Sequence, residues 1–190
     1  MNFIIKLLVF SFLLGSNCSC ANKKINKNEE IIQRVRQIEI GCFYKESTIP
    51  SDEKYPFNIA DKIELVSHIS PWEEPEIKGD SIFVDSFMIR NIQERVILNQ
   101  IQTDSLNTIL YNYTSNLEFH GYACYAPRHS IIFYKDNLPI AYIDICLSCY
   151  RMKMSEKIAI AYFCLEKKCM LQNYFKSLGL KYGFAEGICN

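Results

Sequence analysis

Four side chains between residues 124 and 149 have the chemistry to form a functional site. They are three thiols and one imidazole: Cys124, His129, Cys146 and Cys149. Such a set supports a structural disulfide, a zinc site with four ligands, or a reactive Cys-x-x-Cys pair. We expect a disulfide from Cys124 to Cys149, or alternatively to Cys146, and no cofactor. The alternative is zinc held by all four side chains.

The expected disulfide follows from the register of a β-hairpin. Residues 136–137 are Asp-Asn, which favours a two-residue turn, and continued pairing away from that turn sets Cys124 opposite Cys149. Opposed strand residues lie within disulfide reach. Pro127 cannot donate to a ladder, and a small shift there would bring Cys146 opposite instead. The Cys-x-x-Cys pair ends a strand, whereas reactive pairs usually begin a helix.

Three further candidates could contact a partner. Arg128 and His129 precede an apolar segment and could bind an anion or a carboxylate. The simpler interpretation, which we favour, pairs Arg128 with Asp144 or Glu118 and leaves His129 partly exposed. Trp72 is the only tryptophan. If it is exposed it could anchor a partner, because tryptophan is enriched at binding hot spots, and the alternative is packing over a sheet edge.

A sheet is needed to position these residues. Strands are predicted where β-branched and aromatic residues cluster between turn residues, and helices where apolar residues recur with helical spacing. The predicted strands cover residues 62–69, 81–88, 92–98, 130–134, 140–146 and 180–184, and the predicted helices cover 29–39, 106–113 and 165–178. Strands and helices do not alternate regularly. We therefore predict an α+β fold, an antiparallel β-sheet with two or three helices packed on it.

The first twenty residues have the pattern of an export signal. The apolar run over residues 3–14 is too short to span a bilayer, and small and polar residues follow it. A cysteine after such a run is typical of bacterial lipoproteins. We expect lipidation at Cys18, with Cys20 as the alternative and plain cleavage after Ala21 as the competing interpretation. The chain then divides into a signal peptide (1–20), a flexible tether (21–30) and a single domain (31–190).

The composition excludes several classes of protein. A chain of 190 residues with 49% hydrophobic residues can bury a core, which excludes a disordered protein. It has 21 basic and 21 acidic residues, so its formal net charge is zero and nothing points to nucleic acid as a partner. The signatures GxGxxG, GxxxxGK[ST], GxSxG and HExxH are absent. Their absence favours a non-enzymatic role.

The run CYAPRHSIIFY, followed by PIAYIDICLSC and YFKSLGLKYG, resembles a group of uncharacterised exported proteins of Bacteroidetes-type bacteria. The shared pattern is C-Y-x-P-R-x-x-I-x-F, a short turn, and I-x-I-C-x-x-C. The resemblance covers about the C-terminal third to half of the chain. It implies an exported protein or lipoprotein and no particular activity.

These features predict an envelope-tethered, non-enzymatic lipoprotein that binds another protein of the cell envelope. An immunity or inhibitor role toward a secreted toxin would suit its size and location. The domain would face the periplasm or the cell exterior, where disulfides persist, and a lipid would hold it on the membrane. The alternative is an extracytoplasmic thiol-redox or zinc-binding protein that uses Cys124, Cys146 and Cys149.

Overall fold

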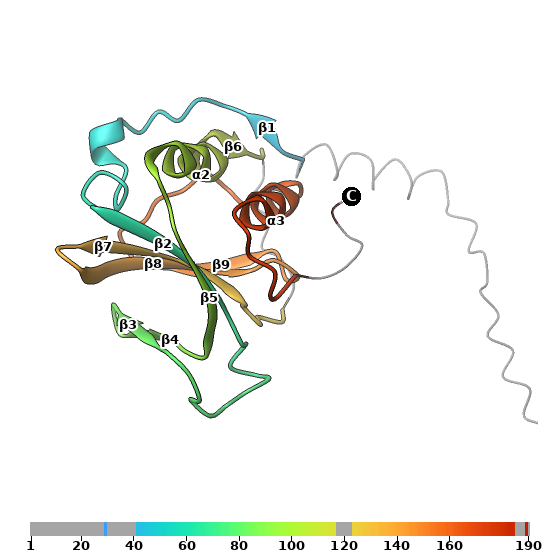
Figure 1. Ribbon diagram of the computed structural model, residues 1–190. Helices are drawn as coiled ribbons and strands as arrows, with labels where there is room; N and C mark the ends of the chain where they lie inside the picture. Colours follow the sequence, from blue (N-terminus) through green and yellow to red (C-terminus); the bar gives the residue numbers. More distant parts are fainter. Residues whose placement is uncertain (1–28, 30–40, 117–122, 185–188, 190) are drawn as a thin grey trace, which may run out of the picture.

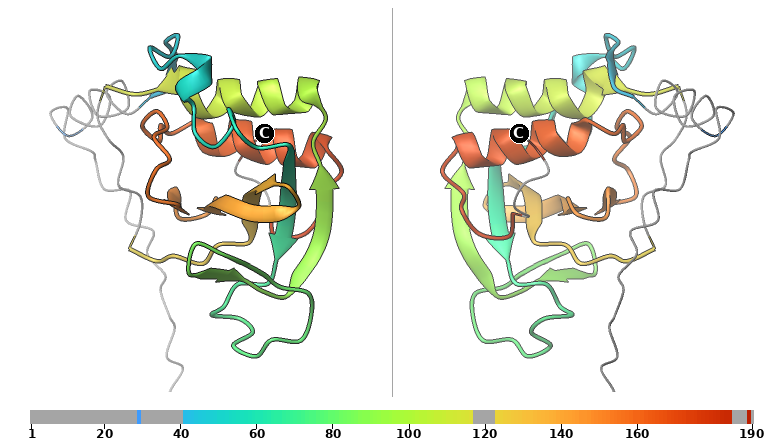
Figure 2. Two further views of the ribbon diagram at one scale, coloured as in Figure 1. Left: turned by 90° about the vertical axis from the view of Figure 1, so that its left-hand side faces the viewer. Right: turned by 90° about the vertical axis from the view of Figure 1, so that its right-hand side faces the viewer.

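The computed structural model describes residues 29, 41–116, 123–184 and 189. This part of the chain forms three layers (Figures 1 and 2). Helices α2 (Gln100–Asn112) and α3 (Lys167–Ser177) cover one face of a five-stranded antiparallel sheet, and a small β-hairpin lies against the other. The predicted α+β class, with helices packed on an antiparallel sheet, is confirmed. We call the two faces the helix side and the hairpin side.

The sheet has the spatial order β5-β2-β7-β8-β9, and every neighbouring pair is antiparallel. Its strands are β2 (Lys62–His68), β5 (Ile92–Ile97), β7 (His129–Lys135), β8 (Leu138–Cys146) and β9 (Arg151–Met154). The smaller elements are β1 (Phe43–Tyr44), which pairs with β6 (Tyr113–Thr114), the hairpin of β3 (Ile82–Val84) and β4 (Phe87–Ile89), and the 3-10 helix η1 (Ser51–Glu53).

The structure differs from the predicted strands at three places. Residues 81–88 form a hairpin rather than one strand, because Asp85 and Ser86 both have positive φ and make a two-residue turn. Strand β9 was not predicted. Residues 180–184 are not a strand, because the backbone N–H groups of Lys181 and Tyr182 donate to the Glu94 carboxylate instead of to a ladder.

The β7–β8 hairpin confirms the predicted turn but not the predicted register. Asp136 and Asn137 have φ of 50° and 63°, as a two-residue turn of this kind requires. The register then shifts between Phe133 and Tyr134, where β8 carries one extra residue next to Pro139. Such a bulge moves every later pair by one position. Pairing also ends at His129, so Cys124 lies outside the ladder.

The helix side holds the larger apolar core. Leu106 and Leu110 of α2 and Leu171 and Phe175 of α3 are buried against the sheet side chains Ile131, Phe133, Ala141, Ile143 and Ile145. Helix α2 begins at a capping box. The Asn99 side chain accepts from the Gln102 backbone, and the Gln102 side chain accepts from the Asn99 backbone. The two reciprocal bonds satisfy backbone donors that would otherwise be unpaired.

Two disulfides brace this side. Cys42, which precedes β1, is bonded to Cys164, and Cys169 of α3 is bonded to Cys189. The lipidation candidates Cys18 and Cys20 lie outside the described residues, as does the predicted helix 29–39 apart from its first residue. Among the helices that are described, none is long and apolar enough to cross a membrane.

Candidate functional site

The three candidate cysteines lie together at the end of β8. Cys146 is bonded to Cys149, so the predicted bonds from Cys124 to Cys149 or to Cys146 are not formed. The bulge in the hairpin and the early end of the ladder account for this difference. The Cys124 thiol is exposed, and its Sγ lies 3.4 Å from the Sγ of Cys149. The prediction that Cys124 lies beside Cys149 is therefore confirmed, but the predicted bond between them is wrong.

The segment that carries Cys124, residues 123–128, is here called the strap. On one side of Cys124, the carbonyl of Ala123 accepts from Nη1 of Arg151 at 3.2 Å. On the other side, the Tyr125 hydroxyl lies 2.9 Å from Oδ2 of Asp144 and 3.0 Å from the Asp144 carbonyl. Both neighbours of Cys124 are therefore anchored to the sheet, and the thiol is held in place between them.

Tyr125 reaches a buried polar network on the hairpin side. Ser130 Oγ donates to Oδ1 of Asp144 at 2.7 Å, and Nε2 of His68 lies 3.0 Å from Ser130 Oγ and 3.2 Å from Oδ1. Burial, and then the neighbouring Asp144 carboxylate, raise the pKa of Tyr125, so its hydroxyl stays protonated and donates. The sequence analysis did not predict this network. It could have been inferred from Ser130 and Asp144, which lie near each other on the two strands of the predicted hairpin.

The network contains the residue types of a hydrolase triad but lacks its geometry. The Ser130 hydroxyl is fully buried and donates to the carboxylate of Asp144, whereas a nucleophile must be exposed and must donate to the histidine. His68 lies beside both partners and is also buried. The arrangement instead satisfies four polar groups inside the protein, and it fixes the strap to the sheet.

His129 lies on the other face of the sheet from this network. Its ring stacks on Phe184 at 4.5 Å, and its Nε2 lies 2.9 Å from the carbonyl of Tyr182, so that nitrogen donates. Burial lowers the pKa of His129 to about 4. The expectation that His129 is partly exposed is wrong, since His129 is buried. The four side chains of the alternative zinc site are not brought together, because Cys146 points to the opposite face of the sheet from His129. Among the described residues, no group of three or more His, Cys, Asp and Glu side chains is arranged to hold a metal.

Arg128 and Trp72 come together at the strap. Nε of Arg128 donates to Oε2 of Glu73 at 3.2 Å, and Nη2 donates to Oε1, so the predicted pairing with Asp144 is wrong. Glu118 lies outside the described residues. The hydrogen bond from Arg128 lowers the pKa of Glu73. Next to Glu73, Nε1 of Trp72 donates to the carbonyl of Tyr125 at 2.7 Å.

Trp72 is exposed although its indole nitrogen is fixed. Trp72 is 80% exposed, and it lies in the connection between β2 and β3. In the β3–β4 hairpin, Phe83 and Met88 face each other and point outward, with Phe83 63% exposed. The inward residues of the hairpin are buried, and the Phe87 ring stacks on Tyr142 at 4.4 Å. Four exposed apolar side chains lie in the segment between β2 and β5, and we call them the apolar surface: Trp72, Ile77, Phe83 and Met88.

A cavity of about 380 Å³ lies between the disulfide loop and α3. Its lining includes Ser148, Arg128 and two buried side chains of α3, Lys168 and Gln172. The Oε1 atom of Gln172 is buried without a hydrogen-bond partner in the structure. Gly183 lines the cavity with a φ of +84°, and a Cβ there would lie 2.8 Å from the Cβ of Arg128. Only glycine fits at that position.

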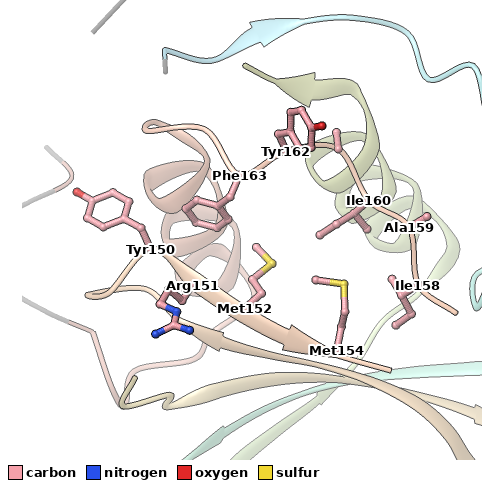
Figure 3. Close-up of a pocket in the computed structure, with 10 residues that line it drawn as sticks. Tyr150, Arg151, Met152, Met154, Ile158, Ala159, Ile160, Tyr162 and Phe163 are labelled. Atoms are coloured by element: carbon pink, nitrogen blue, oxygen red, sulfur yellow. The ribbon is translucent and has the colours of Figure 1, made fainter. Parts of the chain in front are cut away.

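A second cavity of about 390 Å³ opens at the edge strand β9 (Figure 3). Met152 and Met154 point from β9 into it, and Ile160 and Phe163 face them from the other side. Most of the lining residues are apolar, and two are methionines, which adapt their shape readily, but polar atoms form about half of the cavity surface. This cleft could accept an apolar group, but it holds neither of the predicted contact residues Arg128 and Trp72.

Comparisons with protein-family models, with curated proteins and with solved structures found no match for this chain.

Proposed function

We propose that this protein is an exported lipoprotein, tethered to the cell envelope, that binds another protein and is not an enzyme. The single observation that carries the proposal is the exposed and anchored side chain of Trp72. A tryptophan whose indole nitrogen is already bonded loses little conformational freedom when a partner covers its ring. Phe83 and Met88 are further exposed apolar side chains of the same segment between β2 and β5. An immunity or inhibitor role toward a secreted toxin would use such a surface.

The tether belongs to the same proposal. The apolar run over residues 3–14 is followed by Cys18, the proposed lipidation site, with Cys20 as the alternative. Intact mass of the envelope-purified protein should show added acyl chains. Replacement C18S should abolish that mass and release the protein from the membrane, whereas C20S should leave both unchanged. The reverse result would assign the lipid to Cys20, and an unlipidated wild-type protein would contradict the tether.

The binding role is tested by cross-linked capture from envelope extract with the full-length protein as bait. Trp72→Ala and Phe83→Ser should each weaken capture of the same partner by about 30-fold or more, because hot-spot residues contribute at least about 2 kcal/mol. The matched control is Leu138→Ser, since Leu138 is 68% exposed but lies at the β7–β8 turn, outside the segment between β2 and β5 that carries the apolar surface.

A second control uses the cleft at β9, where Met154→Ala should leave capture unchanged. Equal losses in the Trp72 and Leu138 variants would contradict a specific surface. A loss confined to the Met154 variant would move the binding site to the cleft.

A second candidate function is extracytoplasmic thiol–disulfide chemistry at Cys124, Cys146 and Cys149. The observation that favours it is the 3.4 Å contact between a free thiol and a disulfide sulfur. The zinc version of this alternative is less favoured, since His129 lies on the opposite face and only three sulfurs remain as ligands. Metal analysis of the reduced protein tests the zinc version, and a stoichiometric zinc signal would support it.

A further inference from the structure

The contact between Cys124 and Cys149 connects two arrangements of one disulfide. Cys149 is bonded to Cys146 and is touched by the thiol of Cys124. We propose that Cys124 exchanges with the Cys146–Cys149 disulfide, so that the protein interconverts between two isomers without any outside oxidant. This proposal deepens the second candidate function and rests on it.

The position of the thiol supports exchange, because attack on a disulfide needs a thiol in contact with one of its sulfurs. Cys124 is exposed, so its proton can leave to water. Its neighbours are anchored at Ala123 and Tyr125, each by hydrogen bonds to the sheet. The thiol is therefore held beside Cys149 rather than reaching it by chance. The sulfur at 3.4 Å is that of Cys149, so the geometry points to Cys149 as the sulfur that is attacked.

The step is balanced within the protein. Cys124 loses a proton to solvent, and its thiolate forms a bond to Sγ of Cys149. The bond between Cys149 and Cys146 breaks, and Cys146 leaves as a thiolate that takes up a proton. One thiol and one disulfide exist before and after the step, and no electrons enter or leave. Cys146 would then be the free thiol, next to the Ser148 hydroxyl, which already lies 3.4 Å from its sulfur.

The two isomers differ in what the disulfide holds. The Cys146–Cys149 bond joins residues only three apart and leaves the strap bound by hydrogen bonds. The Cys124–Cys149 bond would join the strap covalently to the end of the sheet. Since Tyr125 accepts the indole hydrogen bond of Trp72, this bond would lie one residue from the anchor of the apolar surface.

The test maps thiols and disulfides in the unreduced full-length protein. Samples held at pH 6, 7 and 8 are acid-quenched, blocked with N-ethylmaleimide and digested with trypsin, which cleaves after Arg128 and Lys135 between the cysteines. We expect maleimide on both Cys124 and Cys146, with the final ratio approached faster at higher pH, because the thiolate is the attacking species. Maleimide on Cys124 alone after long incubation at every pH would overturn the proposal.

Two matched variants test the choice of sulfur. Cys146→Ser leaves Cys124 beside Cys149 and should form that bond under mild oxidation. Cys149→Ser leaves Cys124 with Cys146, which it does not touch, and should form at least tenfold less bond in the same time. Equal yields from the two variants, or bond formation in neither, would overturn the proposal. The Cys42–Cys164 and Cys169–Cys189 bonds, mapped in the same digest, verify that each variant has folded.

Exchange with an outside thiol is a separate measurement. Cys124→Ser keeps the Cys146–Cys149 disulfide, and its reduction by added glutathione reports whether that disulfide reacts with partners. Reduction in this variant together with failed internal exchange would contradict the present proposal and leave the second candidate function intact. Internal exchange without reduction by glutathione would support both, and would restrict the chemistry to exchange within the protein. Capture of a protein partner through Trp72 is measured separately, and its result affects neither internal exchange nor reduction by glutathione.

Discussion

The two faces of the central sheet are closed by different means. The helix side is held by an apolar core and by two disulfides, one of which joins residues 122 apart in sequence. The hairpin side has a smaller apolar cluster, a buried polar network and the strap, which carries the free thiol of Cys124. A disulfide stabilises mainly by restricting the unfolded chain, and the restriction grows with the loop it closes. The helix-side disulfide with the long loop, Cys42–Cys164, therefore suits a stabilising role, whereas the Cys146–Cys149 disulfide, which closes a loop of only three residues, suits exchange.

The largest expected effect compares the disulfides directly. Serine replacement of both Cys42 and Cys164 should lower the free energy of unfolding by about 5 kcal/mol, and replacement of both Cys146 and Cys149 by only about 1.5 kcal/mol. These values follow from sequence separations of 122 and 3. Guanidinium unfolding of the three proteins measures the difference. Equal losses would remove the contrast between the two faces.

The next effect concerns a buried cation on the helix side. Nζ of Lys167 donates to the carbonyls of Leu110, Ala161 and Tyr162 at 3.1–3.2 Å, and burial lowers the pKa of Lys167 to about 7. Lys167→Met removes three hydrogen bonds from a charged donor, although the Leu110 carbonyl still accepts from the Ala161 backbone, and it should cost about 4 kcal/mol of stability. The exposed Lys157→Met is the control and should cost less than about 0.5 kcal/mol. Chemical unfolding at pH 6 checks both, and similar losses would show that the three bonds contribute little.

A third effect is a pH dependence that originates on the helix side. The pKa of His129 is about 4 in the folded protein and about 6.5 when unfolded, so the unfolded chain binds more protons between these values. Stability should therefore be full above pH 6.5 and fall by about 3 kcal/mol as the pH drops to 4. His129→Phe should flatten this part of the profile. Two charged groups also act on the pKa of His129, Glu94 raising it and Arg128 lowering it, and both remain in the variant. An unchanged slope would contradict the assignment.

The smallest effect on stability belongs to the strap. Tyr125→Phe removes the hydroxyl that bonds to Asp144 and should cost about 1.5 kcal/mol, since one hydrogen bond to a charged group is lost. It should also slow exchange between Cys124 and Cys149, because the thiol is no longer held beside its target. Unfolding and maleimide mapping measure the two effects on the same variant. A loss as large as that of Lys167→Met would mean that the strap stabilises the fold as much as the helix side does.

The fold class and the central hairpin were predictable because local patterns determine them. The Asp136–Asn137 turn and the β-branched strands beside it have strong short-range signals, and both are present. The hairpin turn at Asp85–Ser86 lacks glycine, and it was missed inside a run of strand-forming residues. The bulge between Phe133 and Tyr134 was missed, because a turn signal sets the pairing beside the turn but not the place where one strand carries an extra residue.

The candidate site was predictable only in part. Proximity of Cys124 to Cys149 followed from the hairpin, and a shift of one residue was enough to change which bond forms. The partners of Arg128 and Trp72 come from segments about 50 residues away in sequence, so no local pattern identifies them. The pairing of Cys42 with Cys164 depends in the same way on tertiary packing, as connectivity among many cysteines generally does.

The long Cys42–Cys164 bond also has a consequence for the order in which the protein matures. A chain is made from its N-terminus, so Cys42 emerges well before its partner, and Cys124, Cys146 and Cys149 all emerge in the interval. Any oxidant present during that interval meets Cys42 with only incorrect partners available. Correct pairing must await the arrival of α3, which makes late oxidation, or repair by a disulfide isomerase, a condition for the yield of native protein.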